Sequence, residues 1–210
     1  MSQKIIASGA EANIILENNL ITKDRIPKGY RLKQIDDKIR KIRTRSETKL
    51  LEKASQIINA PQPQAQKDKN STKIKMPFIK GKKLSEHLDS LPEKQAEKVC
   101  NAIGESIAKL HDADIIHGDL TTSNIILDEK DKNKEKVWFI DFGLGFHSAR
   151  IEDKAVDIHL IKQALEAKHF QHWEKYLKYI LEGYKTSANS TKVLEQLKKV
   201  ESRGRYKEKY

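Results

Sequence analysis

The chain has 210 residues, of which 37% are hydrophobic and 34% are charged, and its formal net charge is +11. The hydrophobic residues are gathered in runs, which suffices for one core or for two small lobes. No run approaches 18 uninterrupted apolar residues and the N-terminal stretch is polar, so we expect neither a membrane span nor a signal peptide. The single cysteine, Cys100, excludes an intramolecular disulfide and indicates a reducing, cytoplasmic location.

The positive charge is concentrated in two segments. Residues 23–53 contain 12 lysines and arginines against 5 acids, and residues 198–210 contain 6 against 2. Together these segments account for the whole net charge, so the remainder of the chain is neutral. This clustering favours a polyanionic partner, with nucleic acid as the first candidate. The alternative is an ordinary solvated helix face and a frayed tail.

The first half of the chain predicts a small sheet and one long helix. Three strands are expected, at 4–7, 12–16 and 20–23. A helix follows over about 31–58, then a polar loop, and then a strand over 74–79 that leads into the second half. We therefore place a strand-rich first lobe at residues 1–79.

The second half, residues 80–210, predicts a mainly helical lobe. A helix begins after Pro92 and continues to about His111, with its apolar residues on one face. Short strands follow at 125–127 and 137–140, around a charged loop that we expect to be mobile. Two or three helices are then expected, near 153–167, 168–185 and 190–200. The fold class predicted is therefore α+β.

The stretch IIHGDLTTSNIILDEKDKNKEKVWFIDFGLG, residues 115–145, alternates apolar runs with short polar loops. Asp141 directly follows the run Val-Trp-Phe-Ile, and Asn124 directly precedes the run Ile-Ile-Leu. Two adjacent strands would place these oxygen ligands side by side, as Mg²⁺ requires. Asp119 would face the same pocket and could accept a hydroxyl proton. Solvated turns are the alternative, but H-G-D-L-x-x-x-N followed by D-F-G indicates phosphoryl transfer.

A site for nucleotide phosphates also needs a cation. Lys23 ends a predicted strand, where its long side chain can point into the cleft. Glu47 lies on the long helix, in line with the apolar residues Leu51, Ala54 and Ile58. A carboxylate on an apolar stripe is costly to bury without a partner, so Glu47 is the candidate that holds Lys23. A solvated position at the edge of the stripe is the alternative.

These residues carry a resemblance to a known family. Lys23, Glu47, Asp119, Asn124 and Asp141 resemble the functional residues of the protein-kinase fold. The resemblance implies a minimal two-lobed fold that uses ATP and Mg²⁺. It also implies catalytic roles for Lys23, Glu47 and Asp119, and metal-ligating roles for Asn124 and Asp141.

Further motifs narrow the resemblance to the small atypical kinase of the KEOPS complex, the PRPK-like family of archaea and eukaryotes. They cover nearly the whole chain: residues 9–12 (GAEA), 28–31 (KGYR), 43–47 (RTRSE), 117–124 (HGDLTTSN), 152–157 (EDKAVD) and 203–206 (RGRY). The resemblance implies a Mg²⁺-dependent serine/threonine kinase or ATPase. In that family it supports a partner synthase that makes threonylcarbamoyl-adenosine in tRNAs reading ANN codons.

The implied partners are the KEOPS synthase subunit, other KEOPS subunits and tRNA. We expect tRNA to contact the basic helix and the basic tail, Lys198–Tyr210. In the tail, Arg203 and Arg205 would bind phosphates, Gly204 would let the backbone conform, and Tyr206 would stack on a base. The competing possibility is that the tail folds back toward the nucleotide cleft.

The nucleotide contacts are expected in two places. The loop over the phosphates would be Gly9, Ala10, Glu11 and Ala12, with one glycine where G-x-G-x-x-G offers three. The adenine would meet the strand that begins at Ile74, with Met76 at the first hinge position. The carbonyl of Pro77 and the N–H of Ile79 would then contact the base, and proline is compatible because only its carbonyl is needed.

Departures from ordinary protein kinases are also informative. Gly118 replaces the usual arginine, and Thr121 stands where many protein kinases have a lysine. Asp157 follows Asp141 by only 16 positions and no A-P-E follows, which leaves little room for an activation segment. Asp157 resembles the helix acid that, through backbone N–H groups, anchors the loop of residues 117–124, called the catalytic loop below.

Two other function classes remain open from the sequence. One is a small-molecule phosphotransferase of the aminoglycoside or choline kinase type, although only 69 residues follow Asp141 to form an acceptor pocket. The other is a non-catalytic tRNA-binding scaffold, which the complete set of kinase residues disfavours. His169 and His172 are three apart on a predicted helix, but no third metal ligand accompanies them.

Overall fold

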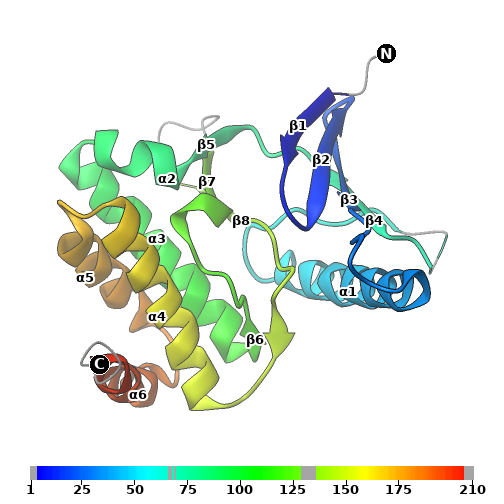
Figure 1. The fold of residues 1–210 in the computed structure, drawn as a ribbon. Coiled ribbons are helices and arrows are strands. Elements are labelled where there is room, and N and C mark those ends of the chain that lie inside the picture. Colours follow the sequence, from blue (N-terminus) through cyan, green and yellow to red (C-terminus); the bar gives the residue numbers. More distant parts are fainter. Residues whose placement is uncertain (1–3, 66–67, 69, 129–135, 206–210) are drawn as a thin grey trace.

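The computed structural model describes residues 4–65, 68, 70–128 and 136–205. Two parts are arranged side by side, one made of strands β1 to β4 with helix α1, the other mainly helical (Figure 1). Strands thus fill the first half of the chain and helices most of the second. The predicted α+β organisation is confirmed.

Four antiparallel strands form the sheet of the first part, in the order β1-β2-β3-β4. Their bounds are Lys4–Ser8, Ala12–Glu17, Leu20–Arg25 and Lys73–Pro77. Asn18 and Asn19 form the turn between β2 and β3 with φ values of 50° and 61°, which asparagine tolerates better than most residues. This turn fixes a register in which Lys23 pairs with Ile14, and on its other side Lys23 pairs with Ile74 of β4.

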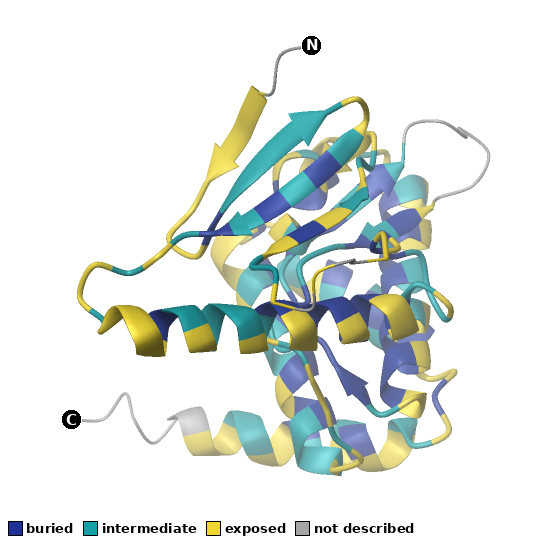
Figure 2. Cartoon of the chain, turned by 90° about the vertical axis from the view of Figure 1, so that its right-hand side faces the viewer, coloured by how far each residue is buried: buried dark blue, intermediate teal, exposed yellow. Residues whose placement is uncertain are grey.

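Helix α1, Lys33–Ala54, connects the two parts through its C-terminal half. Leu50, Leu51 and Ala54 belong to the same apolar cluster as the helices of the second part. The N-terminal half is less buried, apart from Asp36, and its first turns extend beyond the sheet (Figure 2). Glu47 lies where the buried half of α1 begins, so packing against both parts fixes its position.

Short strands of the second part lie around the catalytic motifs. The sheet β5-β7-β8 is antiparallel, and a two-stranded sheet pairs β6 with β9. The strands are β5 Gly81–Lys83, β6 Ile115–Ile116, β7 Ile125–Asp128, β8 Val137–Phe139 and β9 Phe146–His147. Three short helices accompany them: α2 Leu84–His87, and the 3-10 turns η1 Leu88–Ser90 and η2 Thr122–Asn124.

Four longer helices complete the second part: α3 Glu93–Asp112, α4 Ile151–Lys168, α5 Trp173–Tyr184 and α6 Ser190–Arg205. Helices α3 and α5 pack so closely that each places a glycine against the backbone of the other. A Cβ atom on Gly104 would lie 2.0 Å from the carbonyl oxygen of Ile180, and one on Gly183 would lie 2.1 Å from that of Asn101. A larger residue at either position would force the two helices apart.

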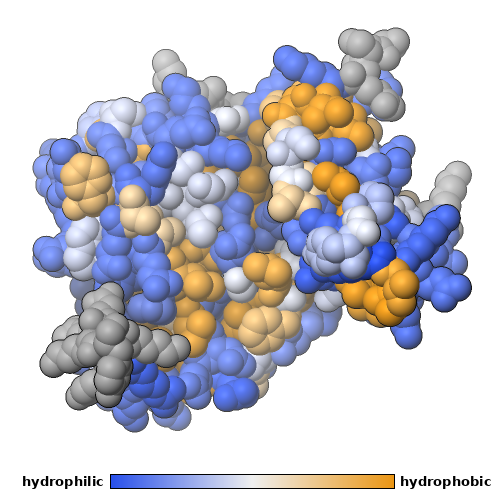
Figure 3. Space-filling model, viewed as in Figure 1, coloured by the Kyte–Doolittle hydropathy of each residue, from blue (hydrophilic) through white to orange (hydrophobic). Residues whose placement is uncertain are grey.

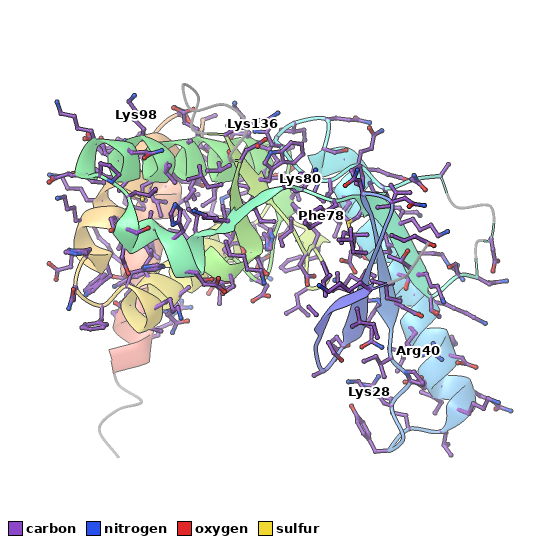
Figure 4. The ribbon with its side chains drawn as sticks, turned by 90° about the horizontal axis from the view of Figure 1, so that it is seen from above. Lys28, Arg40, Phe78, Lys80, Lys98 and Lys136 are labelled. Atoms are coloured by element: carbon purple, nitrogen blue, oxygen red, sulfur yellow. The ribbon has the colours of Figure 1, made fainter. Side chains whose placement is uncertain are left out.

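The two parts are joined by the connection between β4 and β5. Phe78 and Lys80 lie on it (Figure 4), and the Phe78 N–H donates to the carbonyl of Asn19 at 2.9 Å. The division that we place between residues 79 and 80 falls here. Exposed apolar side chains also gather on the strand-rich part (Figure 3), where Ile5 and Ile6 of β1 are 60% and 41% exposed.

The structure corrects several expected boundaries. The long helix is shorter than 31–58, because it begins at Lys33 and the residues after Ala54 form hydrogen-bonded turns. Helix α4 continues to Lys168, and α5 begins only at Trp173. The elements β5, α2, η1, β6 and β9 were not predicted, because they are too short to show a periodic pattern. The charged loop expected to be mobile lies largely outside the described residues.

The basic tail also differs from expectation. Helix α6 continues to Arg205, so Gly204 lies inside a helix and not in a flexible segment. Lys162 of α4 donates to Glu201 at 2.7 Å, and Arg203 donates to Glu152 at 2.5 Å. The first residues of the tail are therefore held against α4, and Tyr206 lies outside the described residues. Within the described part of the chain, every helix is too short or too polar to cross a membrane.

Candidate active site

Strand β3 places two cations in the interior. Its residues alternate between the two faces of the sheet, so Ile21, Lys23 and Arg25 share the inner face and are 8%, 6% and 4% exposed. The ammonium of Lys23 donates to Glu47 Oε1 at 2.7 Å and to Asp141 Oδ1 at 2.6 Å. The expected ion pair between Lys23 and Glu47 is therefore present.

Glu47 is 1% exposed and is held by two cations. In addition to Lys23, the guanidinium of Arg25 donates to Glu47 Oε2 at 2.5 Å. Both carboxylate oxygens are thus paired, which offsets the large cost of burying the charge. The sequence interpretation did not include Arg25, although the period of two along β3 places it on the same face as Lys23.

Asp141 lies two residues after the end of β8. Its backbone has a φ of 64°, and its carboxylate points toward Lys23. Its Oδ1 also accepts the N–H of Gly143 at 3.1 Å. Burial raises the pKa of Asp141, but the charge and the hydrogen bond of Lys23 outweigh it, so the net pKa is below the ordinary value. The carboxylate is therefore ionised at neutral pH. The next residue, Phe142, is completely buried and anchors the turn in the core.

Asp119 and Asn124 are linked across the catalytic loop. The amide nitrogen of Asn124 donates to Asp119 Oδ2 at 2.8 Å and to the Asp119 carbonyl at 3.0 Å. This arrangement fixes which way the amide of Asn124 points, because its nitrogen faces Asp119. Its oxygen remains available as a ligand, and so does Oδ1 of Asp119 as a proton acceptor.

Asp157 of α4 anchors the catalytic loop by accepting hydrogen bonds from its backbone. Its carboxylate, 1% exposed, accepts the N–H of His117 at 2.9 Å and that of Gly118 at 2.8 Å. His111 lies 3.2 Å away and contacts the same carboxylate. Burial lowers the pKa of His117 by more than the negative charge of Asp157 raises it, so the ring is neutral. Its Nε2 donates to the carbonyl of Ile140 at 3.1 Å. The anchoring that the resemblance implied for Asp157 is present.

Several of these side chains line one cavity of about 500 Å³. Lys23, Asp119 and Asp141 belong to its lining, together with the loop residues Gly9, Ala10, Glu11 and Ala12. The remaining lining residues are Ala7, Ser8, Ile14, Arg25, Arg43, Gly143 and Leu144. Residues from both parts thus converge, although Lys23 and Asp141 are 118 positions apart in sequence.

Five predicted site residues lie outside the lining of this cavity: Glu47, Asn124 and the hinge residues Met76, Pro77 and Ile79. Glu47 is connected to the cavity through Lys23 and Arg25, and Asn124 through Asp119. Met76 is half-buried against the core, Pro77 is exposed at the end of β4, and Ile79 lies in the connection between the parts. The adenine contacts of the hinge stay a prediction.

The donor set fits Mg²⁺. Asp141 supplies an ionised carboxylate whose side chain is 44% exposed toward the cavity, and Asn124 offers a neutral amide oxygen. These are hard oxygen donors, and a Mg²⁺ ion bound with a nucleotide takes its other ligands from phosphates and water. Accordingly, the described residues contain no cluster of three or more His, Cys, Asp or Glu side chains suited to a metal.

The structure also shows what His169 does. Its ring lies 2.9 Å from Asp89 Oδ2 and 3.2 Å from the hydroxyl of Thr122, which belongs to the catalytic loop. His169 is 2% exposed and braces that loop from the end of α4. The rings of His169 and of His172, three positions on, both contact Tyr176. No sequence pattern identifies this role, because the partners lie far apart along the chain.

Comparison with known proteins places this geometry in a family. The protein kinase domain family matches residues 6–186. The KEOPS complex subunit Bud32 of Pyrococcus abyssi is 40% identical over 220 residues, covering 98% of this chain and 97% of that protein. A probable serine/threonine-protein kinase BUD32 homolog of Archaeoglobus fulgidus is 35% identical, covering 96% of this chain and 95% of that one.

The chain is also similar to part of a longer protein and to a solved structure. A probable bifunctional tRNA threonylcarbamoyladenosine biosynthesis protein of Methanobrevibacter smithii is 42% identical over 98% of this chain, which corresponds to 37% of that longer protein. Among solved structures, the GDP and kanamycin complex of APH(2'')-IIia superposes with a TM-score of 0.62 at 12% identity, covering 93% and 81% of the two chains. That likeness shows the fold alone. The chain belongs to the protein kinase family and, within it, to the family of the small atypical kinase Bud32.

Proposed function

We propose that the chain is a Mg²⁺-dependent ATP phosphotransferase or ATPase that acts as a KEOPS subunit and supports threonylcarbamoylation of adenosine in tRNA. One observation carries the catalytic part of the proposal. Lys23 lies between Glu47 and Asp141, at 2.7 and 2.6 Å, in the cavity that Asp119 also lines. The names of the relatives from Pyrococcus abyssi and Methanobrevibacter smithii support the KEOPS and tRNA part.

The geometry suggests how the residues divide the work. Lys23, oriented by Glu47, binds the phosphates of the nucleotide. Asp141 and Asn124 would hold Mg²⁺, whose positive charge offsets the charge that develops on the transferring phosphoryl group. Asp119 holds the attacking hydroxyl or water and accepts its proton. Positioning and fixed charges supply most of the rate enhancement in reactions of this type.

The proposed partners are the synthase subunit, other KEOPS subunits and tRNA, in the cytoplasm. The two basic segments support a tRNA contact, because the first turns of α1 and the last turns of α6 extend toward the same side of the molecule (Figure 2). Activation by a partner is favoured over activation by phosphorylation. Only residues 144–150 lie between the D-F-G motif and α4, and β9 ties them to β6.

The test is ATP turnover by the purified chain, alone and with the synthase subunit and tRNA. Asp141→Asn should abolish Mg²⁺-dependent turnover, because it removes the charged ligand. Asp37→Asn is the matched control, since it removes a carboxylate from the far end of α1 and should leave turnover unchanged. We expect the synthase subunit to raise turnover of the wild type. Full activity of Asp141→Asn would contradict the site assignment. Turnover that the synthase subunit does not change would contradict the proposal that this subunit activates the chain.

A further inference from the structure

A carboxylate of the phosphate loop lies among three cations. Glu11 Oε2 accepts a hydrogen bond from Arg43 at 2.8 Å and lies 4.0 Å from the guanidinium of Arg25. Glu11 Oε1 lies 3.9 Å from the ammonium of Lys28, which also donates to the carbonyl of Ala10. The cations come from β3, from the segment before α1 and from α1 itself, so this acid connects three separate elements.

Three of the four charged residues of this cluster line the cavity of the active site, and Lys28 lies just outside the lining, next to Glu11. Glu11, Arg25 and Arg43 line it together with Lys23 and Asp141. Arg25 is 4% exposed and its Nε, fully buried, has no hydrogen-bond partner among the described residues. A buried guanidinium with an unused donor is costly, and it is best satisfied by an anion that several donors can share.

The backbone of the loop offers little to a phosphate group. Gly9 is its one glycine, and a Cβ atom there would meet only the carbonyl oxygen of Ala12, at 3.9 Å. The conformation and the space at Gly9 therefore do not require glycine. Loops that cradle phosphates with backbone N–H groups need glycines for close approach, so here the positive charge must come from side chains.

The charge of Lys23, the cation expected to bind the phosphates, is already balanced by carboxylates. Lys23 is paired with both Glu47 and Asp141, and Arg25 is paired with Glu47. Arg43 has no carboxylate partner among the described residues besides Glu11, whose side chain is 54% exposed and can move. A loop acid facing incoming phosphates would repel them if it stayed in place.

We propose that Arg25, Lys28 and Arg43 form a second phosphate-binding site, and that Glu11 occupies it until the terminal phosphates of a nucleoside triphosphate displace the carboxylate. This inference rests on the proposed nucleotide site, which it deepens by naming side-chain ligands for the phosphates. Glu11 is then an internal competitor of the triphosphate. It keeps the cations satisfied in the empty site and lowers the affinity for ATP.

The experiment measures binding by calorimetry for Mg-ATP, Mg-ADP and inorganic tripolyphosphate with Mg²⁺. The variants are Glu11→Gln, Arg43→Gln and the double variant, and thermal unfolding verifies that each is folded. Glu105→Gln and Lys94→Gln are the matched controls, because these side chains are exposed, lie outside the cavity lining and change the net charge equally.

We expect Glu11→Gln to tighten binding of ATP and of tripolyphosphate by about threefold to tenfold, the scale of partly exposed ion pairs. The gain for ADP should be smaller, since it lacks the terminal phosphate. Arg43→Gln should weaken binding of both triphosphates, and Glu11→Gln should bring little gain in that background. The controls should bind as the wild type does.

Different failures point to different errors. Unchanged or weaker triphosphate binding by Glu11→Gln would overturn the inference, because the acid would then only support the loop. An equal gain in the presence and absence of Arg43 would overturn it too, since the effect would be general electrostatics. If the wild type binds tripolyphosphate in the predicted pattern but does not bind ATP, the second phosphate site stands and the proposed function fails.

Discussion

The backbone carbonyl of Leu144 occupies the space that a side chain on Gly118 would need. A Cβ atom on Gly118 would lie 2.3 Å from that oxygen, and Gly118 has a φ of 76°. The arginine that ordinary protein kinases carry at this position cannot be accommodated. The replacement noted in the sequence therefore follows from the short segment after Asp141, which runs back against the catalytic loop.

The first prediction concerns this contact. Gly118→Ala should destabilise the fold by about 1–3 kcal/mol or more, because it combines an unfavourable backbone conformation with a clash. Urea unfolding of the two proteins measures the difference. Gly29→Ala is the control, since nothing lies within 4 Å of its Cβ position. Equal stability of Gly118→Ala and the wild type would contradict the close approach.

The second prediction separates catalysis from binding at Asp119. Asp119→Asn should lower turnover by about two orders of magnitude or more, the scale of general-base effects, because the amide does not accept the proton. Its ATP affinity should stay within several-fold, since Lys23 and Asp141 are unchanged. Single-turnover rates and equilibrium binding measure the two quantities separately. Loss of affinity with intact turnover of bound ATP would assign Asp119 a different role.

The third prediction concerns the thiol of Cys100. This residue of α3 is fully buried, and burial raises its pKa to about 12. A thiol reagent should therefore react very slowly with the native protein even at pH 9, where an ordinary thiol, with a pKa of about 8.5, is largely ionised. In urea the reaction should be complete, and no other cysteine contributes to the signal. Rapid labelling of the native chain would show that α3 is less protected than its packing indicates.

The fourth prediction concerns tRNA. Exchange of Lys198, Lys199 and Arg203 for glutamine should weaken tRNA binding and make its salt dependence shallower, by about 0.9 in log–log slope for each phosphate that the protein no longer neutralises. Binding measured at several salt concentrations gives both quantities. Because Arg203 also pairs with Glu152, thermal unfolding must show that α6 stays packed.

The matched control for the tRNA prediction removes three exposed lysines from other helices, Lys94, Lys109 and Lys178. It changes the net charge equally and should leave the slope unchanged. A slope that responds equally to both triple variants would mean that overall charge, and not the end of α6, determines binding. An unchanged slope in the α6 variant alone would make the basic helix α1 the better candidate.

How much of the fold could be read from the sequence depended on the length of each element. The strands of the first sheet and the helices α1 and α3 show clear periods, and they lie within a few residues of their expected positions. The two-residue strands β6 and β9 carry no period, and they form only because the chain returns past the catalytic loop. The sequence predicts a flexible segment at the end of α6, where Gly204 would let the backbone conform, but ion pairs with α4 hold this end in a helix.

The candidate site divides in the same way. Asp119, Asn124 and Asp141 could be found from local spacing, because short motifs at the ends of strands fix their positions. The period of two along β3 places Arg25 beside Lys23, but the contacts of Arg25 and Arg43 with Glu11 could not be found, because they depend on how the loop bearing Glu11 folds over the cavity. A charge pattern gives the number of cations in a segment but not which acid each one meets.

Helix α1 has a mechanical consequence. Its first residue, Lys33, lies roughly 21 Å from Glu47 along the axis, at about 1.5 Å per residue. A tilt of about 5° around Glu47 therefore moves the exposed end by about 2 Å, while the carboxylate itself hardly shifts. The helix therefore acts as a lever that turns about Glu47, beside Lys23, and its N-terminal part is the long arm. A macromolecule that binds the basic N-terminal part of α1 would fix the orientation of Glu47 with little force. It would do so without contacting the nucleotide.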